Sequence, residues 1–297
     1  MHIEEIIAQE IALVSKITGV EPRRIELNQG GLQCRVYIIN DGQIVFKFPR
    51  KNSKGQHSVR FDVEKKVVGI VNQLPQTVSL PKVLYESNND SYLGFTGVKG
   101  ENLKYGKLSK IQAVSVGKQV ANFIKQLHIY SSQNRNLTVP IYGLESQIEI
   151  WLGWYNKEIF KSLGFTLVEV ERIDILLKHL IEKLRELKEQ RVLSHGDLSQ
   201  SNILFDYNNN KVGVIDFNLS GYYDIAADFS VLHNPIVCNQ MLNQYGADDV
   251  LREKVKLRRA IRAITVIGIS AMYDKKEKVK EFVLRIRESL KEYEQLF

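Results

Sequence analysis

The chain has 297 residues, of which 25% are charged, and carries a formal net charge of +7. This length allows one large domain or two smaller ones with a sizeable buried core. Its apolar runs are much shorter than the roughly 20 residues that span a bilayer, and its acidic N-terminal segment lacks the basic start and apolar stretch of a secretory signal. We therefore expect a cytoplasmic protein with no membrane partner.

The positive charge favours an anionic partner but does not select nucleic acid. Basic residues are interspersed with acidic ones, and no zinc-finger, RNP or zipper pattern is present. A nucleoside triphosphate is itself an anionic partner. Cys34 and Cys238 lie far apart and form no C-x-x-C pair, which argues against a disulfide framework or a zinc site. We expect no nucleic-acid partner and two buried thiols.

The first hundred residues have the pattern of a sheet with two helices. Apolar residues at helical spacing predict a helix over 3–18. Strands are predicted at 25–27, 34–39, 44–48, 83–85 and 92–98, and a second helix around 61–68. Gly30 and Gly31 form a flexible tip between the first two strands, whose backbone N–H groups can approach phosphates. A simple hairpin turn is the competing interpretation.

A lysine and a glutamate in this part of the chain suggest a phosphate-binding pair. Lys47 follows apolar Val45 and Phe46 in a predicted strand, as does the strand lysine that contacts nucleotide phosphates in kinases. Glu64, in the predicted helix around 61–68, can hold this lysine by an ion pair. The competing interpretation is that both are solvated surface charges, which is the usual state of Lys and Glu.

The sheet pattern ends at Lys99-Gly100, and nearly everything beyond is predicted to be helical. Helices are expected at 109–130, 145–163 and 167–189, and three more within 235–297. This change predicts an N-terminal nucleotide-binding lobe over 1–97 and a C-terminal lobe over 98–297. A nucleotide base would lie at the crossing, where backbone groups of Thr96 and Val98 can hydrogen-bond it.

The most informative stretch is 191–220, which is predicted as a loop, a strand, an Asn-rich turn and a second strand. Pairing the two strands would bring Asp197 and Asn202, which precede the first, close to Asp216, which follows the second. Oxygen-bearing side chains of this kind are the ligands that Mg²⁺ prefers, together with water and substrate phosphates. Protein kinases have the same three residues in the same order. Asp and Asn as mere turn formers are the competing interpretation.

On these residues the chain resembles the aminoglycoside phosphotransferase family, small-molecule kinases with a protein-kinase-like fold. The resemblance covers nearly the whole chain, and in outline it is similar to the 2″-aminoglycoside and macrolide phosphotransferases. It rests on His195-Gly196-Asp197-Leu198 with Ser201-Asn202-Ile203-Leu204, on Val214-Ile215-Asp216-Phe217, on 224–229, and on Phe46-Lys47-Phe48-Pro49. It implies an α+β, two-lobed fold with an antiparallel sheet lobe and a larger, mostly helical lobe.

The resemblance also implies a role for each matching residue. Asp197 would orient the substrate hydroxyl and finally accept its proton, while Asn202 and Asp216 would hold Mg²⁺. Lys47, braced by Glu64, would bind the phosphates of ATP or GTP. His195 would fix the loop that carries Asp197 by hydrogen bonding. Asp228, from a later segment, would be the acidic support of the same loop. The predicted activity is a magnesium-dependent transfer of the γ-phosphoryl group to a hydroxyl of an aminoglycoside antibiotic.

The acceptor is the least determined part of this prediction. Aminoglycosides are polycations, and the enzymes that modify them line the acceptor cleft with carboxylates, whereas residues 246–297 contain thirteen Lys or Arg against nine Asp or Glu. A macrolide or a small metabolite of the choline or homoserine type therefore remains an alternative acceptor. Asn218 stands where protein kinases have glycine, which argues against a protein substrate. From another class, the alternative is a catalytically inactive binding module that keeps the fold.

Overall fold

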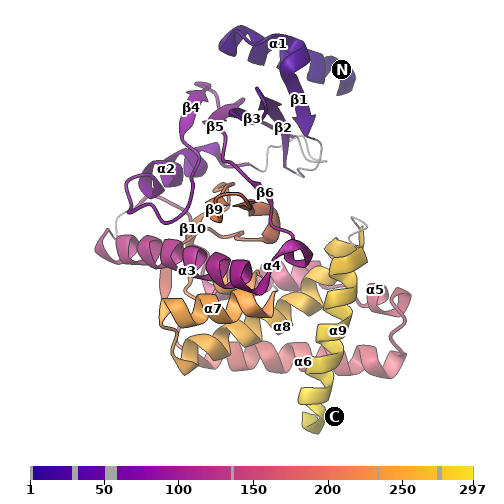
Figure 1. The fold of residues 1–297 in the computed structure, drawn as a ribbon. Coiled ribbons are helices and arrows are strands. Elements are labelled where there is room, and N and C mark those ends of the chain that lie inside the picture. The colour runs from indigo at the N-terminus through magenta and orange to yellow at the C-terminus, as the bar shows by residue number, and fades with distance from the viewer. Residues whose placement is uncertain are drawn as a thin grey trace.

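The computed structural model describes residues 3–28, 33–50, 59–134, 137–232, 234–272 and 276–296. They form a smaller lobe built on an antiparallel sheet and a larger lobe built mainly of helices (Figure 1). The chain passes from one to the other near residues 97–100. A lobe division at residue 97 stays a prediction.

The sheet of the smaller lobe has five strands, close to those predicted. They are β1 (Ile25–Asn28), β2 (Cys34–Ile39), β3 (Ile44–Pro49), β4 (Val83–Glu86) and β5 (Leu93–Thr96). Their order across the sheet is β1-β2-β3-β5-β4, and all neighbours are antiparallel. Strand β3 is therefore central, so a side chain on it is held by a neighbour on each side.

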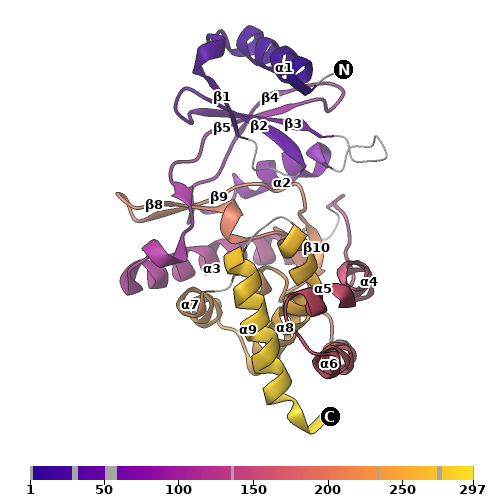
Figure 2. The same cartoon turned by 90° about the vertical axis from the view of Figure 1, so that its right-hand side faces the viewer.

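Two helices cover opposite faces of this sheet, α1 (Ile3–Thr18) and α2 (Phe61–Val71) (Figure 2). Phe46 and Phe48 of β3 are buried in the cluster that includes Val14 of α1. Because successive side chains of a strand point to opposite faces, Lys47 between them faces the α2 side. The alternation of a single strand thus directs the lysine toward the helix that carries Glu64.

An ion pair and a hydrogen bond at Glu10 fix helix α1 to the sheet. Glu10 accepts hydrogen bonds from Arg35 Nε at 2.7 Å and Nη2 at 2.6 Å, and from the Tyr37 hydroxyl at 2.6 Å. A bidentate Arg–carboxylate pair is directional as well as strong. Glu10 therefore sets the position of α1 over β2.

The larger lobe contains seven α-helices among its described residues. They are α3 (Lys110–Gln133), α4 (Leu144–Trp154), α5 (Lys157–Ser162), α6 (Leu167–Glu186), α7 (Pro235–Tyr245), α8 (Asp249–Met272) and α9 (Lys276–Glu292). The three helices predicted within 235–297 are confirmed. The segment predicted to be helical over 145–163 consists of two helices: Asn156 accepts a hydrogen bond from the Glu158 N–H at 2.9 Å and starts α5 as a separate helix.

Two small sheets line the side of the helical lobe that faces the first lobe. One pairs β6 (Glu101–Asn102) with β8 (Ile203–Asp206) and β9 (Lys211–Val214), and the other pairs β7 (Arg191–Ser194) with β10 (Gly221–Asp224). The β8–β9 hairpin is the one predicted. The loop predicted from residue 191 is wrong in its first four residues. These residues form β7, which pairs with β10, about thirty residues later in the sequence.

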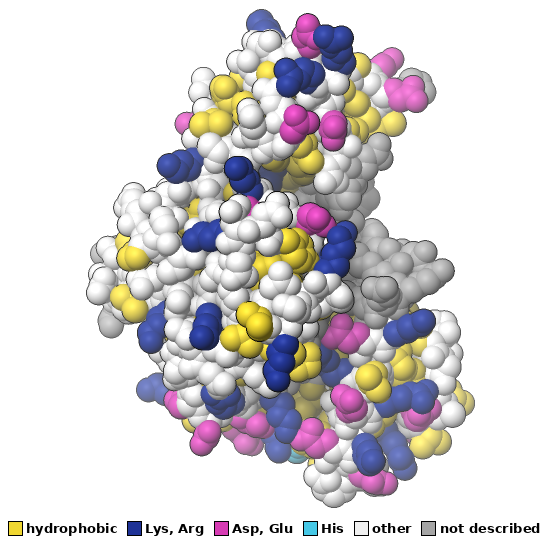
Figure 3. Space-filling model, in the orientation of Figure 1, with side chains coloured by type: hydrophobic (Ala, Val, Ile, Leu, Met, Phe, Trp, Pro, Cys, Tyr) yellow, Lys and Arg dark blue, Asp and Glu magenta, His cyan; other side chains and the backbone are white. Residues whose placement is uncertain are grey.

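One apolar core runs through both lobes. It joins Val67 of α2 and Phe95 of β5 to Phe123 of α3 and Phe205 of β8, and a second core lies between α4, α5, α6, α8 and α9. Cys34 and Cys238 are buried and unpaired. Within the described residues, no helix combines the length and apolar character needed to cross a bilayer. On the face in Figure 3, basic and acidic side chains are interspersed.

Candidate active site

The three polar residues predicted around the central hairpin do converge. Asn202 Nδ2 donates to Asp197 Oδ2 at 3.0 Å and to the Asp197 carbonyl at 2.8 Å. The β8–β9 ladder continues one step beyond the strands, where the Ile215 N–H donates to the Asn202 carbonyl at 3.0 Å. This bond places Asp216, the next residue, beside Asn202. The hairpin therefore closes the distance between residues 197 and 216, as its sequence pattern predicts.

Lys47 connects this cluster to the sheet lobe. Its Nζ lies 2.5 Å from Glu64 Oε1 and 2.7 Å from Asp216 Oδ1. The Lys47 and Glu64 side chains are 12% and 1% exposed, so water screens their attraction little. Strand β3, helix α2 and the segment after β9 thus meet at one ammonium group. Sequence reasoning predicted the pair with Glu64 but not the direct contact with Asp216.

The two carboxylates that share this ammonium are shifted in opposite directions. Burial raises the pKa of Glu64, and Lys47 only partly offsets this. Burial also acts to raise the pKa of Asp216, but there the ammonium of Lys47 prevails and the pKa is lowered. Burial would lower the pKa of Lys47, yet Asp216 and Glu64 together raise it. Asp216 is therefore the carboxylate that stays ionised most readily, as a cation ligand requires.

The backbone at Asp216 is held in an unusual conformation. Its φ is +70°, in the left-handed region that residues other than glycine rarely adopt. The next residue, Phe217, is fully buried, with its ring centroid 4.7 Å from that of His195 and 6.3 Å from that of Phe123. Such a conformation persists only where the surroundings impose it. The anchored phenylalanine therefore aims the Asp216 carboxylate at Lys47.

The loop that carries Asp197 is held from behind by His195 and Asp228, both fully buried. Asp228 accepts hydrogen bonds from the N–H groups of His195 at 2.8 Å and Gly196 at 3.0 Å. His195 Nε2 lies 3.0 Å from the Ile215 carbonyl, while its Nδ1 accepts from the Asp197 N–H at 3.3 Å. This network needs the imidazole proton on Nε2. Both nitrogens are thus engaged with backbone, which leaves His195 a supporting role.

Gly196 is required by this arrangement. Its φ is +85°, and a Cβ at this position would lie 2.1 Å from the Leu219 carbonyl oxygen. Only glycine lets the chain turn here while Leu219 stays in contact. The turn places Asp197 immediately after the glycine, at the edge of the cluster.

Residues near the predicted base position are only partly described. Gly30 and Gly31 lie outside the described residues. The Thr96 N–H donates to the Lys82 carbonyl at 2.8 Å, so only its carbonyl is left for a base. The backbone of Val98 makes no hydrogen bond to another described residue. Gln33, just beyond the glycine tip, accepts from Asn218 Nδ2 at 3.0 Å and so ties the two lobes together.

Sequence reasoning missed three residues on the Asp197 side of the cluster. Tyr223 stacks on Tyr142 with ring centroids 4.6 Å apart and an interplanar angle of 20°. Burial lowers the pKa of the Arg262 guanidinium, and the nearby Asp197 carboxylate and Tyr223 oppose this. The signal in the sequence is the recurrence of basic residues every four positions, at Lys254, Arg258 and Arg262, which places them along one face of α8.

Asn202 and Asp216 can supply part of a site for a divalent cation. The described residues contain no group of three or more His, Cys, Asp and Glu side chains that could hold a metal alone. Asn202 uses its Nδ2 on Asp197, which leaves its amide oxygen for another partner, and Asp216 uses one carboxylate oxygen on Lys47. One amide oxygen and one carboxylate fit an ion such as Mg²⁺, which takes its other ligands from phosphates and water.

Comparisons with known proteins agree with this geometry. Residues 24–257 match the model of a family described as the phosphotransferase enzyme family. The structure is similar to that of the GDP and kanamycin complex of APH(2")-IIia, with a TM-score of 0.71 and 19% identity over 94% of this chain and 98% of that chain. It is also similar to the streptomycin-ATP-APH(2")-IIa ternary complex, with a TM-score of 0.61 and 19% identity over 93% and 96% of the two chains.

A third similar structure is that of the choline kinase LicA from Streptococcus pneumoniae. Its TM-score is 0.63 at 15% identity, over 98% of both chains. Sequence identities of 15–19% establish a similarity of fold and not of function. The predicted two-lobed, kinase-like fold is therefore confirmed.

Proposed function

Because the chain belongs to the phosphotransferase enzyme family, we propose that it moves the γ-phosphoryl group of ATP or GTP to a hydroxyl of a small molecule. The observation that carries this proposal is the convergence of Asp197, Asn202, Asp216 and Lys47 from distant parts of the chain. Their order and chemistry match the parts that kinases use for phosphoryl transfer.

Asp197 is the residue in our proposal that acts on the acceptor. Its carboxylate orients the acceptor hydroxyl and takes its proton as the hydroxyl oxygen bonds to the γ-phosphorus. The bond from that phosphorus to the bridging oxygen breaks at the same time, and the nucleoside diphosphate leaves with the electron pair. Asn202 keeps one Asp197 oxygen in place through its 3.0 Å hydrogen bond, so the other remains for the hydroxyl. Positioning of this kind supplies much of the acceleration in enzymes.

The donor side is assigned to the remaining residues. Lys47 would bind the nucleotide phosphates, held in place by Glu64, and Asn202 with Asp216 would hold Mg²⁺. The ion would neutralise charge on the transferred group. We assign Val98, the carbonyl of Thr96 and the backbone at Gly30 and Gly31 to the base and phosphates.

We propose an aminoglycoside as the acceptor, because the proteins of similar structure include complexes with kanamycin and streptomycin. The sequence motifs point the same way. This choice of acceptor can be checked against the charged side chains near Asp197, because a polycation such as an aminoglycoside requires carboxylates around its binding site.

One observation favours a second candidate, a neutral or anionic small metabolite. Arg262 lies near Asp197 and Tyr223, on the helix face that also carries Lys254 and Arg258. Lys254 is paired with Asp224 at 2.7 Å, and Arg258 stacks over Trp151 and bonds to Gln147. Arg262 has no such partner among the described residues. A guanidinium there repels a polycation and attracts a carboxylate or phosphate on the acceptor.

An acceptor panel tests these candidates directly. Nucleoside diphosphate release is measured with ATP or GTP, Mg²⁺ and an aminoglycoside, a macrolide, choline, homoserine or a sugar acid as acceptor. We expect one class to raise turnover far above the rate with water alone. Arg262→Gln distinguishes the two candidates, because it should lower KM for a cationic acceptor and raise KM for an anionic one.

Asp197→Asn is the control for catalysis. Asparagine can still accept the hydrogen bond from Asn202, but it cannot take a proton. We expect kcat to fall by about 10²–10⁴, with the Kd of the nucleotide changed less than threefold. An unchanged kcat would exclude the assigned role. If no acceptor and no donor gives transfer, the inactive binding module replaces the enzyme.

A further inference from the structure

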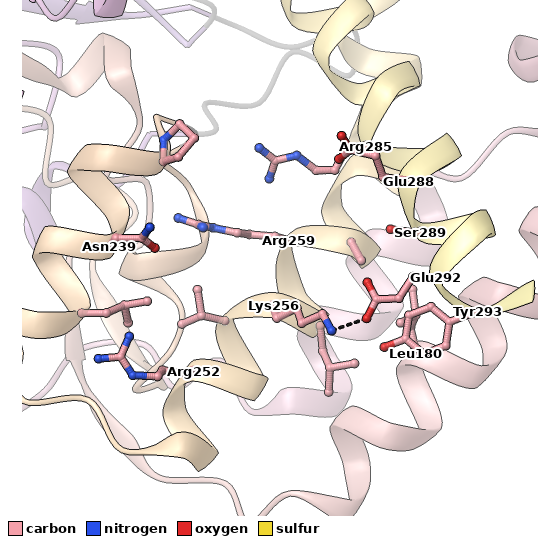
Figure 4. A pocket seen from close by; sticks show the side chains of 15 residues that line it. Leu180, Asn239, Arg252, Lys256, Arg259, Arg285, Glu288, Ser289, Glu292 and Tyr293 are labelled. Atoms are coloured by element: carbon pink, nitrogen blue, oxygen red, sulfur yellow. Dashed lines mark hydrogen bonds and ion pairs between the residues drawn. The ribbon is translucent and has the colours of Figure 1, made fainter.

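A second site candidate lies in the helical lobe, away from the residues assigned to phosphoryl transfer. It is a groove of about 430 Å³ between α6, α7, α8 and α9 (Figure 4). Neither Asp197 nor Lys47 lines it. Its volume is within the range of small-molecule pockets.

The groove is lined by more cations than carboxylates. Arg252, Lys256 and Arg259 come from α8 and Arg285 from α9, against Glu288 and Glu292 of α9. Lys256 is paired with Glu292, which removes one charge of each sign. Three arginines and Glu288 then remain on the lining, and Glu281, which is not part of the lining, pairs with Arg285, so the net charge is +1. The groove is therefore electropositive.

Two of the three arginines, Arg252 and Arg259, are satisfied by neutral groups, and Arg285 by a carboxylate. Arg252 donates to the Asn243 side-chain oxygen at 2.9 Å, and Arg259 Nη2 to the carbonyls of Phe229 at 3.1 Å and Leu232 at 2.8 Å. Arg285 Nη2 bonds to Glu281 on its own helix at 2.9 Å. Neutral acceptors leave a guanidinium's charge largely uncompensated. An anion in the groove would compensate it.

Two of these arginines, Arg259 and Arg285, extend into the same part of the groove, and their positive charges repel each other. Figure 4 places the side chains of Arg259 and Arg285 one above the other, both extending toward the α7 side of the groove. Burial lowers the pKa of Arg285, Glu281 opposes this, and Arg259 lowers it further. The Nε–H of Arg259 is buried and has no acceptor among the described residues. An oxyanion bound between the two guanidinium groups would offset their mutual repulsion.

We propose that this groove binds a small molecule bearing a phosphoryl group, at a site separate from the phosphotransfer cluster. Arginine forks match phosphate oxygens in geometry, and two of them suit a dianion better than a single carboxylate. The groove is larger than a bare phosphate needs, so an organic phosphate fits it. This inference does not depend on the proposed acceptor or donor.

The choice of variant follows from the contacts of each arginine. Arg259 holds the carbonyl of Phe229, the residue after Asp228, which in turn holds the catalytic loop. Removing Arg259 would disturb that loop and confuse the result. Among the described residues, Arg285 bonds to Glu281, one turn away on its own helix, and is the better target. Its matched control is Arg185 of α6, which bonds to one carboxylate, Glu145, at 2.6 Å and lies outside the groove.

The experiment is calorimetric titration with inorganic phosphate and with glucose 6-phosphate at constant ionic strength. It uses the full chain with a chelator present, so that magnesium-dependent binding at the other site is suppressed. We expect both probes to bind the wild type, and Arg285→Gln to weaken both at least tenfold. Arg185→Gln should stay within twofold of the wild type. Equal affinity in Arg285→Gln and Arg185→Gln would overturn the proposal, as would absence of binding to the wild type.

Two further measurements complete the test. Without phosphate, Arg285→Gln loses both a repelling charge and its ion pair with Glu281, so the melting temperatures of Arg285→Gln and Arg185→Gln serve as folding controls. If Arg285→Gln does not fold, Arg252→Gln replaces it with the same expectation, since the partner of Arg252 within the described part of the chain is the neutral side chain of Asn243. Acetate is the third probe. Acetate binding as tight as phosphate binding would overturn the assignment of a phosphoryl ligand.

Discussion

The buried ion pair between Lys47 and Glu64 gives a prediction that is independent of any substrate. Replacing Lys47 by methionine keeps a long apolar side chain on β3 but removes the ammonium. Glu64, 1% exposed, is then left as a carboxylate without its cation. Breaking one side of a buried pair typically costs about 3–5 kcal/mol. We expect the free energy of unfolding of Lys47→Met to fall by that amount at neutral pH.

The geometry supports this magnitude. The atoms are 2.5 Å apart and both side chains are nearly excluded from water. Unit charges whose centres lie about 4 Å apart attract by about 4 kcal/mol at an effective dielectric constant near 20. Lys65 is the matched control, because it is a neighbour of Glu64 in sequence whose 3.0 Å pair with Glu86 is 30% and 58% exposed. Lys65→Met should cost less than about 1 kcal/mol.

The pH dependence has a definite sign. Burial raises the pKa of Glu64 above its ordinary value of 4.5 in the folded state. A raised carboxyl pKa destabilises the folded state at high pH, and this penalty vanishes below the unfolded pKa, where the group is protonated in both states. Removing Lys47 removes a charge that lowers this pKa, so the penalty grows. The loss of stability in Lys47→Met should therefore shrink as pH falls toward 4.5.

Urea unfolding followed by circular dichroism measures these effects, with Lys47→Met/Glu64→Gln as the decisive variant. Removing the orphaned charge should recover more than half of the lost free energy. The reasoning fails if the double variant is as unstable as Lys47→Met, or if the loss in Lys47→Met is the same at pH 4.5 and pH 8.

Three further predictions concern the loops and the metal. Gly196→Ala should lower the free energy of unfolding by about 2–4 kcal/mol, because the new Cβ would lie 2.1 Å from the Leu219 oxygen. Gly69→Ala is the control, because nothing lies within 4 Å of its new Cβ; its free energy of unfolding in urea should rise by about 0.5–1 kcal/mol. Asp228→Asn, which turns one acceptor into a donor facing backbone N–H groups, should lower kcat at least tenfold with KM for nucleotide little changed, as measured by steady-state kinetics. Chelation by EDTA should abolish turnover, and titration with Mg²⁺ should restore it at a half-maximal concentration at least tenfold higher in Asp216→Asn than in the wild type.

The polar residues of the candidate site were found from sequence because their signals are local. Asp197, Asn202 and Asp216 flank one hairpin, so a single short-range pairing brings them together. Lys47 stands in a strand of alternating burial, and the helix with Glu64 follows in the same lobe. The helices were likewise predicted from a local pattern, since apolar residues recur at helical spacing in α3 and α6. Where the sequence pattern was weak, at β7, the predicted loop was wrong, and β10 was not predicted.

By itself the sequence determined a sheet lobe followed by a helical lobe and the approach of Asp197, Asn202 and Asp216 at one hairpin, because residue type, hydrophobic period and turn residues act over a few neighbours. The kinase-like fold followed from the resemblance of its motifs to a known family. Only the tertiary structure decided that Lys47 touches Asp216 across 169 residues, that Arg262 lies near Asp197, and that Arg259 and Arg285 line one groove. These contacts depend on how helices and lobes pack against one another, and packing is set by the whole buried surface at once. A side chain's neighbours across such an interface leave no periodic trace in the sequence around it.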